Sequence, residues 1–154
     1  MTLQPRLYNR CPVFCVFPGV GKTTLAKLKP EGVVGIHRPD LRGSSAYIEL
    51  IEAARDSDKA VLVPSYPWLI DALQSAGIPT ALVYPTKALK AHYLDRYRAM
   101  GSSVEYITGM ERAFESAIDQ LTRRTQGTRH IQLDGPDQYL SDVDFFKVFD
   151  RAVL

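Results

Sequence analysis

A short glycine-containing segment, residues 16–24, constrains this chain more than any other feature. It reads VFPGVGKTT and carries the pattern Gly-x-Gly-Lys-Thr. An almost wholly apolar run at 11–17 leads into it and suits a buried parallel strand, while 24–28 can continue as a helix until Pro30. A strand, a glycine-rich turn and a helix start are the setting of a phosphate-binding loop, so the sequence predicts a loop of the Walker A type.

The residue types of this segment suit phosphate for separate reasons. Gly19 and Gly21 permit backbone angles at which successive N–H groups converge on phosphate oxygens. Lys22 would reach the β- and γ-phosphates, and the Thr23 hydroxyl would bind Mg²⁺. The full pattern has a further glycine where this chain has Val16. An ordinary glycine turn with an exposed lysine is the alternative, but it does not explain the preceding strand.

Composition sets limits without naming a function. The 154 residues suit a single domain, 1–154, and a net charge of +2 indicates no polybasic surface for nucleic acid, although small basic clusters remain compatible with it. No apolar run approaches the ~20 residues of a membrane span. Cys11 and Cys15 would lie about 13 Å apart on one strand, too far to form a disulfide. We therefore expect a cytoplasmic protein and no membrane partner.

Apolar strand patterns alternate with helical patterns along the chain. Strands are expected at 11–17, 32–37, 60–63, 79–84 and 129–133. Helices are expected at 44–55, 68–76, 86–100 and 110–124. This alternation predicts an α/β fold, with a mostly parallel five-stranded sheet between two helical layers, an α/β/α sandwich.

Parallel sheets bind ligands at the carboxyl ends of their strands, and this rule sorts the acidic residues. Asp56 and Asp58 precede the third strand and so lie at the amino ends of the strands, away from the expected ligand site. Asp40 follows the second strand and lies at the carboxyl end. No aspartate follows the third strand, so the metal would depend mainly on Thr23, phosphates and water. Asp40 is the candidate acid that orients an acceptor hydroxyl; capping of its own turn is the alternative.

Four further residues are candidates for contact with an acceptor or a transferred phosphate. Arg38 and Arg42 flank Asp40 and would meet an anionic acceptor, unless they are surface charges. On the helix 86–100, Arg96 lies at the edge of the apolar face and is the preferred catalytic arginine, with Arg98 the weaker candidate. An arginine whose stem covers the core is the alternative for Arg96.

Three segments carry a family resemblance. Residues 17–23 resemble the Phe-Pro-Gly-x-Gly-Lys-Ser/Thr loop of small phage-type P-loop kinases. Residues 83–101 and 135–143 are similar to the fourth strand, the lid-like helix and the C-terminal motif of that family. The chain departs from the family in having His37-Arg38 for an acidic pair, Ser65-Tyr66 for a Ser-His pair, and Met100 for an arginine.

The resemblance implies a kinase-like strand order of 2-3-1-4-5 and a relation to nucleoside and nucleotide kinases. We expect an ATP-dependent kinase that needs Mg²⁺ and phosphorylates a nucleoside, a nucleotide or a similar acceptor. One alternative is a kinase of 5-hydroxymethyluracil in DNA, and a second is a non-catalytic ATP-binding module. If the chain is phage-encoded, the expected location is the host cytoplasm. Trp68 is expected in the core, with base stacking as the alternative, and the tail 141–154 is expected to pack on the domain or a partner.

The expected site residues follow from these arguments. The catalytic residues are Lys22, Asp40 and Arg96, and Thr23 is the metal ligand. The acceptor residues are Arg38, Arg42, Ser65 and Arg98. The nucleotide-binding residues are Pro18, Gly19, Val20, Gly21, Lys22, Thr23 and Thr24.

Overall fold

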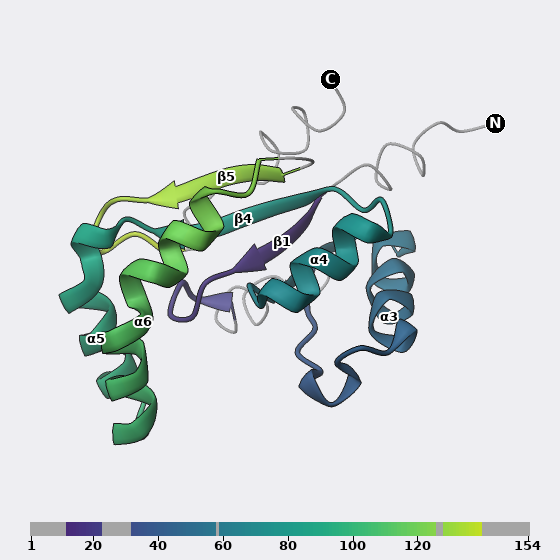
Figure 1. Cartoon of the computed structure of the whole chain (residues 1–154). Helices are drawn as coiled ribbons and strands as arrows, with labels where there is room; N and C mark the ends of the chain where they lie inside the picture. Colours follow the sequence, from purple (N-terminus) through teal and green to yellow (C-terminus); the bar gives the residue numbers. More distant parts are fainter. Residues whose placement is uncertain (1–11, 23–31, 58, 126–127, 140–154) are drawn as a thin grey trace.

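Five parallel strands form one sheet in the order β2-β3-β1-β4-β5 (Figure 1). The computed structural model describes residues 12–22, 32–57, 59–125 and 128–139. The strands are β1 Val13–Val16, β2 Val33–Gly35, β3 Ala60–Pro64, β4 Thr80–Pro85 and β5 Thr128–Leu133. The helices are α3 Ser45–Asp56, α4 Pro67–Ser75, α5 Lys90–Ala99 and α6 Val104–Thr122, with short 3-10 turns η1 Pro39–Leu41 and η2 Lys87–Leu89. The predicted fold class and strand order are confirmed.

β1 lies at the centre of the sheet and is paired on both sides. Cys15 is in register with Val63 of β3 and with Leu82 of β4, and all four residues of β1 are buried. A strand buried on both faces is continuously apolar, which is why 11–17 could be recognised from sequence. Because the neighbours run parallel to β1, the segments that follow β1, β3 and β4 leave the sheet at the same edge.

Three helices cross between strands on the same face of the sheet. α3 lies between β2 and β3 in the chain, α4 between β3 and β4, and α6 between β4 and β5. All three connections move in the same direction across the sheet, so right-handed crossovers place these helices on one face. Figure 1 shows these helices together on one side of β1, β4 and β5. The connection from β1 to β2, with the helix predicted at 24–28, lies outside the described residues.

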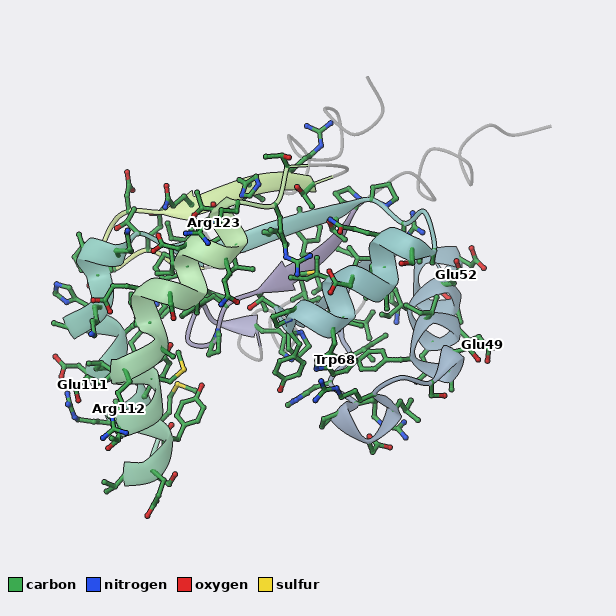
Figure 2. All side chains as sticks on the ribbon, in the orientation of Figure 1. Glu49, Glu52, Trp68, Glu111, Arg112 and Arg123 are labelled. Atoms are coloured by element: carbon green, nitrogen blue, oxygen red, sulfur yellow. The ribbon has the colours of Figure 1, made fainter. Side chains whose placement is uncertain are left out.

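The helices present apolar faces to the sheet and charged residues to solvent. On α3, Tyr47 and Ile51 are buried, while Glu49 and Glu52 are exposed and point away from the sheet (Figure 2). This division into an apolar and a charged face is typical of a helix that packs on a sheet. No helix in the described part of the chain is both long enough and apolar enough to cross a membrane.

An aromatic cluster joins the end of β1 to the helices α5 and α6. The Phe17 ring lies 5.4 Å from that of Phe114 and 6.3 Å from that of Tyr93, measured between centroids, in edge-to-face geometry. All three side chains are buried. Such edge-to-face pairs add to the free energy of apolar burial, so the segment after β1 is fixed where it leaves the sheet.

Two helix starts differ from the sequence prediction by more than two residues. The segment predicted as one helix at 86–100 begins with the 3-10 turn η2 before α5. α6 begins at Val104, six residues earlier than predicted. Its first turns contain β-branched residues and Gly109, which are weak helix formers, and this hid the helix from sequence analysis. Ser103 starts the helix by accepting a hydrogen bond from the Tyr106 amide at 3.1 Å.

Ser44 is the N-cap of α3, and its replacement tests this assignment. Its hydroxyl accepts a hydrogen bond from the Ala46 amide at 3.1 Å. Ser44→Ala should lower the free energy of unfolding by about 1 kcal/mol, because that amide loses its partner. Urea unfolding would measure the change, and Ser45→Ala, one residue inside the helix, is the control. Equal losses in the two variants would contradict the assignment.

Candidate functional site

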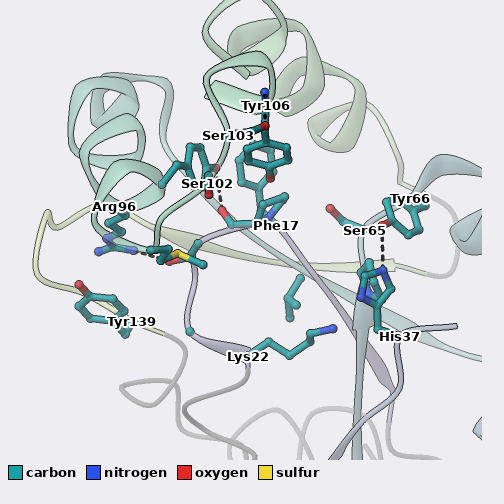
Figure 3. A pocket seen from close by; sticks show the side chains of 17 residues that line it. Phe17, Lys22, His37, Ser65, Tyr66, Arg96, Ser102, Ser103, Tyr106 and Tyr139 are labelled. Atoms are coloured by element: carbon teal, nitrogen blue, oxygen red, sulfur yellow. Dashed lines mark hydrogen bonds between the residues drawn. The ribbon is translucent and has the colours of Figure 1, made fainter. Parts of the chain in front are cut away.

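A cavity of about 710 Å³ opens at the carboxyl edge of the sheet, where the strand ends converge (Figure 3). Its walls come from the loop after β1, from the segments after β2 and β3, and from the region where α5 meets α6. The lining residues are Val16, Phe17, Pro18, Gly19, Gly21, Lys22, His37, Pro64, Ser65, Tyr66, Arg96, Tyr97, Met100, Ser102, Ser103, Tyr106 and Tyr139. The predicted phosphate-binding loop therefore forms part of the wall of a cavity.

The loop has a conformation that depends on its two glycines. The φ angles of Gly19 and Gly21 are +92° and +99°, in the left-handed region that favours glycine. The Phe17 amide donates to the Val83 carbonyl oxygen at 2.8 Å, and Val20 between the glycines is buried. The backbone conformation therefore favours glycine at both positions, as the sequence predicted. Val20 anchors the loop and does not line the cavity.

Gly19 also allows α5 to approach the loop closely. A Cβ atom at this position would lie 3.0 Å from Tyr97 Cε1 and 3.1 Å from Tyr93 Cδ2, closer than ordinary contacts. The Tyr97 hydroxyl donates to the Pro18 carbonyl oxygen at 2.8 Å. Two tyrosine rings therefore hold the outer side of the loop in place.

Arg96 connects the loop to the segment that follows β5. Its Nη1 donates to the Gly19 carbonyl oxygen at 2.8 Å, and its Nη2 donates to the carbonyl oxygens of Pro136 at 2.8 Å and Gln138 at 3.1 Å. A guanidinium suits this task because its planar array of donors reaches several acceptors at once. Arg96 thus joins two parts of the chain that are far apart in sequence.

Aromatic rings cover both sides of the same guanidinium. Its central carbon lies 4.3 Å from the centroid of the Tyr93 ring and 3.9 Å from that of the Tyr139 ring. Arg96 lines the cavity, as its predicted role requires, but its hydrogen bonds give it a positioning function. The predicted contact with a transferred phosphoryl group stays a prediction.

Lys22 lies at the end of the loop and lines the cavity. Its partial burial lowers the pKa of the ammonium group, and no carboxylate among the described residues forms an ion pair with it. An anion in the cavity would supply the missing countercharge. These features fit the predicted contact with nucleotide phosphates.

The predicted metal ligand cannot be compared with the structure. Thr23 and Thr24 lie outside the described residues, so the expected contact of Thr23 with Mg²⁺ stays a prediction. Within the ranges that the structure describes, no three side chains of the His, Cys, Asp or Glu type gather closely enough to hold a metal ion.

Asp40, the predicted acceptor acid, does not line the cavity. Its carboxylate accepts hydrogen bonds from Arg38 Nε at 3.0 Å and Nη2 at 2.9 Å, and its side chain is 59% exposed. These bonds lower the pKa of Asp40 and raise that of Arg38. The sequence placed Asp40 correctly after β2, but it did not reveal that the η1 turn directs this carboxylate to its neighbour.

Of the four predicted acceptor residues, one lines the cavity and three do not. Ser65 lines the cavity. The Arg42 guanidinium lies 5.5 Å from the centroid of the Trp68 ring, and Arg98 forms an exposed ion pair with Asp95 at 2.7 Å. Arg38, Arg42 and Arg98 are absent from the cavity lining, so Ser65 is the one of these four that the structure places at the cavity.

Several lining residues were not predicted. His37 and Tyr66 follow β2 and β3 directly, so the rule that pointed to Asp40 could have found them. Tyr106 lies in the first turn of α6, which the sequence did not reveal as a helix, and Ser102 and Ser103 directly precede that helix.

Trp68 belongs to the packing behind the cavity. Its ring stacks on that of Tyr66 at 5.5 Å with an angle of 15° between planes, and it meets the Tyr47 ring edge-on at 5.9 Å. Trp68 is partly buried, packs against the core and does not line the cavity, so it lies at the edge of the core that was expected to contain it. Tyr66 presents the aromatic surface to the cavity instead.

The fold and the cavity define an α/β protein with a parallel sheet of order 2-3-1-4-5 and a glycine loop at its carboxyl edge, an arrangement consistent with P-loop and Rossmann-like folds. No protein-family model matches the chain, and no curated protein matches its sequence.

Replacing Arg96 tests whether it fixes the loop. Arg96→Lys should lower the free energy of unfolding by about 1–3 kcal/mol, because an ammonium group cannot reach all three carbonyl oxygens. Arg98→Lys on the same helix should change it by about 0.5 kcal/mol or less, since that pair is exposed. Urea unfolding of both variants would measure the difference, and matching values would argue against the positioning role.

Proposed function

We propose that this chain is an ATP-dependent phosphotransferase of the P-loop kinase type, acting on a nucleoside, a nucleotide or a similar acceptor. The observation that carries the proposal is the loop with Gly19 and Gly21 in left-handed conformations, which leads to Lys22 at the wall of a large cavity. The resemblance of residues 17–23 and 83–101 to small phage-type P-loop kinases supports it further.

The roles of the loop follow from its chemistry. Backbone N–H groups and Lys22 would bind the phosphates, and Thr23 would bind Mg²⁺. A bound Mg²⁺ would neutralise charge on the phosphates. Arg96 and Tyr97 would hold the loop in its binding conformation through their bonds to the carbonyl oxygens of Gly19 and Pro18. Positioning of this kind is a large part of catalysis of phosphoryl transfer.

The cavity suits an anionic ligand with a planar ring. Its volume of about 710 Å³ lies within the usual range for small-molecule sites. Four tyrosines line it, and no aspartate or glutamate does so in the described part of the chain. Tyrosine rings stack on nucleobases, and the cationic groups Lys22 and Arg96 favour phosphate.

A non-catalytic ATP-binding module is the second candidate, and one observation favours it. Asp40, the expected acceptor acid, is paired with Arg38 outside the cavity, and the described lining residues include no other carboxylate. A protein with this lining could bind nucleotide without transferring phosphate, unless another group handles the acceptor proton.

Lys22→Ala tests nucleotide binding. The variant should bind ATP about 10- to 100-fold more weakly, because the phosphates lose a charged hydrogen bond. Isothermal titration calorimetry would measure the affinity. Lys87→Ala is the control, since Lys87 forms an exposed pair with Asp119 and does not line the cavity. Unchanged affinity in Lys22→Ala would remove the loop from the argument.

Transfer of the labelled γ-phosphate of ATP separates the two candidate functions. The protein would be incubated with Mg²⁺ and a panel of nucleosides, nucleotides and DNA that contains 5-hydroxymethyluracil. We expect one class of acceptor to be labelled, which would also distinguish a small-molecule kinase from a DNA kinase. ATP binding with no labelled acceptor would instead support the binding module.

A further inference from the structure

His37 and Tyr66 meet at the cavity wall (Figure 3). The His37 Nε2 atom and the Tyr66 hydroxyl oxygen are 3.0 Å apart, within hydrogen-bond distance, and the ring centroids are 6.0 Å apart. His37 follows β2 and Tyr66 follows β3, and these two strands are parallel neighbours in the sheet. The fold therefore brings the two side chains together at the edge where the phosphate-binding loop lies.

Both members of the pair are held in place by surrounding contacts. Tyr66 stacks on Trp68. On either side of His37, Tyr47 of α3 donates to the Ile36 carbonyl oxygen at 3.0 Å and accepts from the Arg38 amide at 3.2 Å. The backbone around His37 is thus fixed to α3, and the ring is oriented by Tyr66. In the tautomer in which Nε2–H donates to the Tyr66 hydroxyl oxygen, Nδ1 carries the lone pair that can accept a proton.

The surroundings of His37 favour its neutral imidazole. The residue is largely exposed, but partial burial at the cavity wall and the positive charge of Lys22 both lower the pKa of His37 from its usual 6.5. Tyr66 faces the ring, Tyr47 bonds the flanking backbone, and the charge of Arg38 on the same segment is paired with Asp40. A neutral imidazole can accept a proton, whereas an imidazolium cannot.

His37 also lies near the expected position of the phosphates. Both side chains line the same cavity, and Figure 3 shows the Lys22 side chain directed toward the wall on which His37 lies. Lys22 is the group that would hold the γ-phosphate. Among the described lining residues His37 is the one whose ordinary pKa lies near neutral pH, and none is a carboxylic acid.

We propose that His37, oriented by Tyr66, is the catalytic base that takes the proton of the acceptor hydroxyl. In this step the hydroxyl oxygen forms a bond to the γ-phosphorus, and the bond from that phosphorus to the bridging oxygen breaks. The bridging oxygen keeps the electron pair and leaves as part of ADP, while the hydroxyl proton passes to the imidazole. The inference rests on the proposed kinase function, and it supplies the proton acceptor that Asp40 does not provide.

Replacement of His37 by glutamine tests the role. His37→Gln retains a hydrogen-bonding group beside Tyr66 but cannot accept a proton. With ATP, Mg²⁺ and the acceptor labelled in the transfer assay, kcat should fall about 100-fold or more. ATP affinity should stay within about twofold, as measured by calorimetry. The matched control is His92→Gln, because His92 is exposed on α5 and does not line the cavity; its kcat should be unchanged.

The pH dependence supplies a second readout. The pKa of His37 is lowered, so wild-type kcat/KM should be constant above pH 6.5 and fall only as the pH drops through that lower value. His37→Gln should lack this decline. Tyr66→Phe keeps the ring on Trp68 but removes the hydroxyl, and it should reduce kcat about 10-fold with little effect on ATP affinity.

Histidine NMR titration tests the geometry without any assay of transfer. The His37 signals of the free protein should titrate below pH 6.5, and Lys22→Ala should move the midpoint upward. An unchanged midpoint in Lys22→Ala would overturn the inference.

The kinetic outcomes distinguish failure of this inference from failure of the proposed function. A wild-type protein that labels acceptor, together with a His37→Gln variant that keeps its rate and pH profile, would overturn the role of His37 alone. A wild-type protein that binds ATP but labels none of the panel would overturn the kinase proposal, and the base with it.

Discussion

The parallel pairing of β1 with β3 and β4 is the constraint on which the rest of the structure depends. Because β1 is hydrogen-bonded on both sides and buried, the loop that follows it has a fixed starting point. The same pairing brings the ends of β2 and β3 to that edge, and with them His37 and Tyr66. The cavity is thus a consequence of sheet topology, and its chemistry depends on the few residues placed just beyond the strand ends.

The loop is held from outside as well as from the sheet. The Tyr97 hydroxyl donates a hydrogen bond to the Pro18 carbonyl oxygen, and the Arg96 guanidinium donates one to the Gly19 carbonyl oxygen. These two carbonyl groups of the loop are therefore held by side chains of α5. This arrangement fixes the orientation of the peptide planes, and orientation is what an anion site made from backbone N–H groups requires. Arg96 also bonds the segment after β5, which makes the conformation of the loop depend on a distant part of the chain.

The sequence predicted the five strands and the position of the loop, because buried strands are continuously apolar and glycine turns have a local signature. The order of the strands was implied by the family resemblance. It did not predict the start of α6, where weak helix formers are stabilised by the Ser103 cap and by packing. It also placed Asp40 in the site, although a neighbouring arginine holds that carboxylate outside the cavity. The sequence shows which residues follow the end of a strand. It does not show which partner a side chain takes there, because that depends on the geometry of the turn.

The stacking of Tyr66 on Trp68 has a consequence for observing this protein. The chain contains one tryptophan, and its ring lies directly behind a tyrosine that lines the cavity. Indole fluorescence responds to small changes in nearby rings and charges, so events at this wall should alter the emission of a single, known fluorophore. The native protein therefore carries its own optical probe at the side of the cavity opposite Arg96 and Tyr139, where no label needs to be introduced (Figure 3).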